Sequence, residues 1–123
     1  MIQGGNASVY ITDMDTAVTF YTAALGLKLK TRIGNEWAEI DAGEGLIIGL
    51  HLARPPETVA AATIGAINIE LRVTQKMERV VETLSKRGVI FQGEILNYEN
   101  VRIASLLDPD SNVIILAEVL HGG

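Results

Sequence analysis

The 123-residue sequence contains no cysteine, which excludes disulfides, thiolate zinc sites and cysteine nucleophiles. A chain without cysteine suits a reducing compartment, and we expect a cytoplasmic location. Apolar runs such as Leu46–Leu50 are too short to span a bilayer. The first residues show neither the basic nor the apolar region of a secretory signal. We therefore expect no membrane partner.

Basic and aromatic side chains are also scarce. Ten Lys and Arg face fifteen Asp and Glu, which gives a net charge of −5 and no basic surface for nucleic acid. An acidic surface most simply provides solubility, although it also attracts cationic ligands. Two Phe, one Trp and three Tyr limit the stacking of a large planar drug.

Hydrophobic residues make up 48% of the chain, enough for the core of one domain. We predict a single domain over residues 1–123. It comprises a first module at about 6–53, a connector at about 54–64 that contains Pro55 and Pro56, and a second module at about 65–120.

The first module begins with an alternating segment, Ala7–Thr12, which predicts a strand. Asp13 is placed to cap a helix that begins at Met14, and Gly26 is placed to end it. Three strands are then expected, at Lys28–Ile33, Trp37–Asp41 and Leu46–Leu52.

The second module repeats this order. Ile67–Val73 predicts a strand, Thr74 is placed to cap a helix that runs to Arg87, and Gly88 ends that helix. Three strands are then expected, at Val89–Leu96, Val101–Leu107 and Val113–Leu120.

A shift of 62 positions aligns the two modules without a gap and predicts an internal duplication. It places Gly26 on Gly88, Val18 on Val80, Thr12 on Thr74, Ile11 on Val73 and Asn6 on Asn68. The alternative is an ordinary α+β domain in which this symmetry is accidental.

The two opening strands alternate between an apolar face and a polar one. The apolar faces are expected to cover the helices. The polar faces are either exposed to solvent or line a cleft, and alternation alone favours solvent. These polar positions are Asn6, Ser8, Tyr10 and Thr12 in the first strand, and Asn68, Glu70 and Arg72 in the second.

Two motifs carry a family resemblance. The first motif resembles the opening of the glyoxalase, bleomycin-resistance and extradiol-dioxygenase (vicinal oxygen chelate) superfamily, and it consists of Asp13, Ala17, Phe20-Tyr21 and Leu25-Gly26-Leu27. The second motif, Leu107–Asn112, resembles the turn before the final strand of that superfamily. The resemblance implies an α+β fold: two tandem β-α-β-β-β modules form a curled mixed sheet around a cleft, with helices on the outer face. Ser111 replaces the usual glycine of that turn, a mild departure.

The resemblance also implies a divalent metal held by His, Gln or Glu of both modules, which acts as a Lewis acid. The corresponding positions here are Asn6, Asn68, Ile115 and the neighbourhood of Ile48. Asparagine is a weak ligand and isoleucine is none, whereas a stable site needs three good ligands. We therefore expect no metal, no cofactor and no assignable catalytic residue.

Other polar and aromatic side chains have two interpretations each. Trp37 is either core or dimer packing or a pocket wall, beside Glu39 on the same strand face. Glu70 is either a salt-bridge partner of Arg72 or a general base. Ser105 lacks a histidine partner for nucleophilic catalysis. The complete expected ligand-binding set is Asn6, Ser8, Tyr10, Trp37, Glu39, His51, Asn68, Glu70, Arg72, Ser105 and Ile115.

Three functions stay open. The first is a metal-independent small-molecule-binding protein similar to the bleomycin-resistance branch, which sequesters a drug or metabolite. The second is a lyase, isomerase or dioxygenase with an unconventional site built from His51, Glu39 or Glu70. The third is an accessory module with a vestigial cleft. The resemblance also implies a homodimer.

Overall fold

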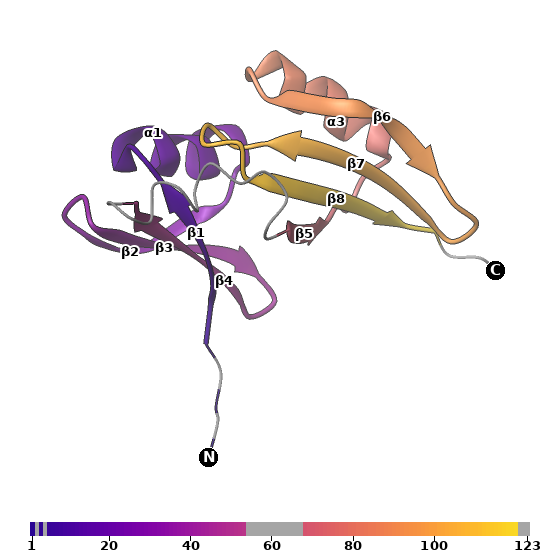
Figure 1. Cartoon of the computed structure of the whole chain (residues 1–123). Coiled ribbons are helices and arrows are strands. Elements are labelled where there is room, and N and C mark those ends of the chain that lie inside the picture. The colour runs from indigo at the N-terminus through magenta and orange to yellow at the C-terminus, as the bar shows by residue number, and fades with distance from the viewer. Residues whose placement is uncertain (2, 4, 54–67, 121–123) are drawn as a thin grey trace.

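The computed structural model describes residues 1, 3, 5–53 and 68–120 (Figure 1). The expected connector at 54–64 lies outside the described residues. The first module comprises β1 (Ala7–Ile11), α1 (Met14–Thr19), a π-helical continuation η1 (Phe20–Ala24), β2 (Lys28–Ile33), β3 (Trp37–Gly43) and β4 (Leu46–Leu52). The second comprises β5 (Asn68–Arg72), α3 (Met77–Lys86), β6 (Ile90–Asn97), β7 (Val101–Leu107) and β8 (Val113–Val119).

Each module forms its own four-stranded mixed sheet. The strand orders are β1-β4-β3-β2 and β5-β8-β7-β6, so the two sheets have the same topology. In both, the first strand pairs in parallel with the last strand of its module, and the other pairs are antiparallel. Gly26 and Gly88 end the corresponding helical segments with φ of 77° and 89°. The predicted fold class of two tandem β-α-β-β-β modules is confirmed.

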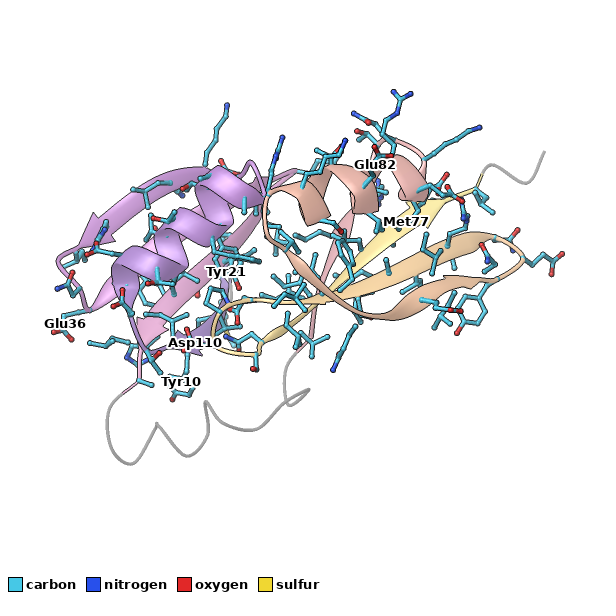
Figure 2. The ribbon with its side chains drawn as sticks, turned by 90° about the horizontal axis from the view of Figure 1, so that it is seen from above. Tyr10, Tyr21, Glu36, Met77, Glu82 and Asp110 are labelled. Carbon is cyan, nitrogen blue, oxygen red and sulfur yellow. The ribbon has the colours of Figure 1, made fainter. Side chains whose placement is uncertain are left out.

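Both helices cover the same side of the molecule, as the view from above in Figure 2 shows. The apolar strand positions under them are buried, including Val9 and Ile11 of β1 and Ile69 of β5, as the alternation predicted. We call the opposite surface of each sheet its helix-free face. Within the described residues, no helix is long and apolar enough to cross a bilayer.

The turn between β7 and β8 joins the second module to the first. The hydroxyl of Tyr21 donates a 2.8 Å hydrogen bond to Oδ2 of the buried Asp108. The backbone N–H of Thr12 donates to Oδ1 of Asp110 at 3.1 Å, and Nδ2 of Asn112 donates to the carbonyl of Tyr10 at 2.9 Å. In Figure 2, Tyr21 and Asp110 lie where the modules meet.

The two helix starts differ. Asp13 caps α1 as predicted, because its Oδ1 accepts the N–H of Thr16 at 2.9 Å, and this bond lowers the pKa of Asp13. The predicted cap at Thr74 is wrong: α3 begins at Met77, two residues later than a helix capped by Thr74 would begin. The N–H of Met77 instead donates to Oε1 of Glu118 at 2.9 Å. The Glu118 carboxylate on β8 therefore caps the N-terminus of α3 in place of a neighbouring residue.

Candidate functional site

Three aromatic side chains gather on the helix-free face of the first sheet. Tyr10 of β1 is the direct cross-strand partner of His51 of β4, and their ring centres lie 5.3 Å apart. His51 also pairs directly with Trp37 of β3, with ring centres 6.2 Å apart at 66°. Tyr10 and Trp37 are partly buried and His51 is exposed. We call these three residues the aromatic cluster.

A glycine holds the indole of this cluster against the sheet. A Cβ added at Gly49 would lie 2.2 Å from Cη2 of Trp37 and 2.9 Å from Cβ of Ser8. Since real Cβ contacts are much longer, the ring occupies the space that any other residue at position 49 would fill. The Trp37 ring therefore lies over Gly49 of β4, and the side chain is partly buried.

The expected residues of the second sheet lie in a separate group. Ile115 of β8 is the direct partner of both Glu70 on β5 and Ser105 on β7, so these three positions adjoin on one face. Arg72 is two residues beyond Glu70, yet its Nη1 lies 3.8 Å from Oε2 of Glu44 in the first module. The structure thus connects Arg72 to the other module.

A cavity of about 650 Å³ lies where the modules meet. Its walls come from the β3–β4 turn of the first module and from β5, β7 and β8 of the second. Its lining residues are Leu27, Ala42, Gly43, Glu44, Leu46, Glu70, Leu71, Arg72, Thr74, Val101, Ala117 and Val119. The cavity contains two expected ligand-binding residues, Glu70 and Arg72, and none of the aromatic cluster.

The residues at the family's metal-ligand positions do not fit a metal ion. Ile115 lies on the helix-free face but has no donor atom, and Ile48 is fully buried among apolar side chains. Asn6 is exposed before β1, and nothing is described of the Asn68 side chain. Among the described residues, no group of three or more His, Asp or Glu side chains is arranged to bind a metal. Asn and Ile side chains at these positions do not supply the three good ligands that a stable metal site needs.

The unconventional enzyme site was expected to involve His51, Glu39 or Glu70. His51 and Glu39 lie on the first sheet, whereas Glu70 lies on β5 of the second sheet. His121 lies outside the described residues. Neither Gly49 nor Glu44 was predicted from the sequence to belong to a site. A lone glycine within the apolar run Leu46–Leu50 was the available signal, because such a glycine often marks a close approach.

Comparisons with known proteins agree with this architecture. The family model described as Glyoxalase/Bleomycin resistance protein/Dioxygenase superfamily matches residues 5–116. No curated protein matches the sequence.

Several solved structures share the fold. TnmS3, an antibiotic binding protein from Streptomyces sp. CB03234, is 24% identical over 97% of each chain, with a TM-score of 0.74. A superfamily member from Sphaerobacter thermophilus is 21% identical over 96% of this chain and 98% of its own, with a TM-score of 0.74. Integron cassette protein HFX_CASS4, from the mobile metagenome of Halifax Harbour Sewage Outfall, is 16% identical over 97% and 100%, with a TM-score of 0.75. With the family match over nearly its whole length and the doubled β-α-β-β-β fold, the chain belongs to the glyoxalase/bleomycin resistance protein/dioxygenase superfamily.

Proposed function

We propose that this protein binds a small planar molecule without a metal, on the helix-free face of the first sheet, and sequesters it as a drug- or metabolite-binding protein. The observation that carries the proposal is the aromatic cluster. Indole and phenol faces bind flat apolar or cationic ligands by stacking. Glu39 lies two residues from Trp37 on the same strand face and supplies a carboxylate there.

Two further observations support the proposal. The family's metal-ligand positions carry Asn or Ile, so those positions offer no strong ligand for the superfamily's chelated metal. A structural relative of similar length, TnmS3, is described as an antibiotic binding protein. A shared fold does not determine the ligand, so the proposal depends on the aromatic cluster.

Exposed apolar residues on the helix-free faces also support a homodimer. Several large apolar residues on the helix-free faces are half or more exposed: Ile33, Ile90, Leu96 and Val119. The described helices α1 and α3 lie on the opposite side (Figure 2), so neither of them covers these faces. Apolar surface of this kind marks an association site. A second copy of the chain would cover it and enclose the aromatic cluster.

The binding test uses two planar probes of opposite charge, proflavine (cation) and anthraquinone-2-sulfonate (anion), measured by calorimetry. We expect proflavine to bind in the presence of EDTA, and the Trp37→Ala variant to weaken that binding by tenfold or more, about 1.4 kcal/mol. Tyr98→Ala is the matched control, because Tyr98 is exposed at the β6–β7 turn, and it should leave affinity unchanged.

Two results would count against the proposal. Equal affinity of the Trp37→Ala variant would remove the aromatic cluster as the site. Loss of binding in EDTA, restored by Zn²⁺ or Mn²⁺, would show that binding depends on a metal.

The dimer is tested separately by light scattering at micromolar concentration: the wild-type protein should have twice the monomer mass, and Ile90→Lys should be monomeric. A monomeric wild-type protein would overturn the dimer.

A further inference from the structure

The β7–β8 turn and the equivalent β3–β4 turn differ in how they contact the other module. The β7–β8 turn docks on the first module through Asp108, Asp110 and Asn112, whose side chains bond Tyr21, Thr12 and Tyr10 as described above. The equivalent β3–β4 turn of the first module faces the second module. Its Asp41 accepts a hydrogen bond from the N–H of Gly43 at 2.8 Å, inside the turn itself. Among the described residues, the one hydrogen bond or ion pair that this turn makes to the second module is the Arg72–Glu44 pair, at 3.8 Å.

The junction cavity occupies the space that this turn leaves open. Its volume of about 650 Å³ lies within the range of small-molecule sites. One side is the β3–β4 turn. The other is the end of the second sheet, where Ala117 is the direct partner of Arg72 and Val119 that of Val101. The short side chain of Ala117 leaves room above the sheet, and both valines provide an apolar wall.

The polar rim of this cavity has an excess of negative charge. Glu44, Glu70 and Arg72 contribute two carboxylates and one guanidinium, and the whole chain carries −5. Arg72 is already engaged by Glu44, at 3.8 Å. An anionic ligand would have to displace Glu44 from Arg72 and would still meet the carboxylate of Glu70. A cationic ligand would compete with Arg72 for Glu44 but would meet two carboxylates.

We propose that the junction cavity is a second binding site, for a small amphipathic amine. The ammonium lies between the carboxylates of Glu44 and Glu70, and the apolar part packs on Val101, Ala117 and Val119. This site shares no residue with the aromatic cluster, although Val119 also belongs to the apolar surface assigned above to the dimer. It does not depend on the function proposed above.

The test compares two probes of equal length and opposite charge, n-hexylammonium and hexanoate, in a titration followed by amide chemical shifts. Small probes of this size bind in the millimolar range at best. We expect hexylammonium to shift the amides of Arg72, Ala117 and Val119 saturably, and hexanoate to bind at least fivefold more weakly. The Glu70→Gln variant should weaken hexylammonium about fivefold. Glu82→Gln, which removes a charge on α3 outside the cavity, should have no effect.

A second variant tests the cavity rather than the charge. Val119 is half exposed, so Val119→Trp should fold while filling the space, and it should abolish the hexylammonium shifts. The site is disproved if hexanoate binds as well as hexylammonium, if Glu70→Gln leaves the affinity unchanged, or if Val119→Trp still binds. Trp37→Ala should bind hexylammonium normally, so failure at one site can be distinguished from failure at the other.

Discussion

Tyr21 and Asp108, 87 residues apart, are joined by a buried 2.8 Å hydrogen bond that crosses from the first module to the second. Burial raises the pKa of Asp108, while the bonds it accepts from Asn112 and Tyr21 oppose that rise. Burial likewise raises the pKa of Tyr21, with a further contribution from the neighbouring Asp108 carboxylate. The phenol therefore remains a hydrogen-bond donor throughout the physiological pH range.

The first prediction concerns this bond. Tyr21→Phe keeps the ring in the core but removes the donor, so we expect the free energy of unfolding to fall by about 1–2 kcal/mol. Asp108 retains the hydrogen bonds from Asn112, which limits the loss. Urea unfolding measures it, with Tyr98→Phe as an exposed control. Equal stability of the two variants would show that the bond adds nothing to module docking.

The second prediction concerns the contact between Gly49 and the Trp37 ring. Gly49→Ala places a methyl in the space of the ring, so we expect the indole to rotate outwards. The Trp emission should shift to longer wavelength, proflavine binding should weaken, and stability should fall by about 1–3 kcal/mol. In a Trp37→Ala background, the Gly49→Ala change should cost much less. A cost that is equal in both backgrounds would contradict the contact.

The third prediction concerns acid stability. Hydrogen bonds from Arg102 hold the pKa of Glu78 at about 2, below its ordinary 4.5. The unfolded chain therefore binds this proton at higher pH than the folded chain does. The stabilisation is fully present above pH 4.5 and is lost as pH falls towards 2. Glu78→Gln should flatten that slope in denaturant titrations, whereas Glu82→Gln should not. Parallel slopes for Glu78→Gln and the wild-type protein would contradict it.

The fourth prediction concerns Ser111, which has a φ of 65° in the β7–β8 turn. A side chain with a Cβ is strained in this left-handed region, and glycine is not. Ser111→Gly should therefore raise the free energy of unfolding by about 1 kcal/mol. Ser111→Ala retains the Cβ and should bring no gain. A similar gain in both variants would show that the serine hydroxyl, and not the backbone conformation, lowers the free energy of unfolding.

Much of the fold was predictable because its signals are local. Alternating residues such as Val9 and Ile11 set a strand face, Asp13 begins a helix through a bond to Thr16, and Gly26 ends it with positive φ. The cap predicted at Thr74 was wrong for a physical reason. The group that receives the Met77 N–H is Glu118, 41 residues away in the sequence, and only folding brings it to the helix start.

The candidate site was less predictable. Period-two alternation correctly grouped Ser8 with Tyr10, and Glu70 with Arg72, because side chains alternate within any strand. It did not show that the aromatic cluster and the pair Glu70 and Arg72 lie in separate places. That separation depends on how the modules pack, which involves contacts between residues far apart in the chain.

The amino-acid sequence by itself determined the two modules and their family, since both depend on residue identity and short-range spacing. It also placed Asn and Ile at the positions that the family resemblance assigns to metal ligands. Only the tertiary structure decided the rest. It placed the indole of Trp37 over Gly49 and joined the β7–β8 turn to the first module through Tyr21. It also formed a cavity between the β3–β4 turn and the second module. Those arrangements arise from cross-strand register and side-chain packing between distant segments, which no local pattern encodes.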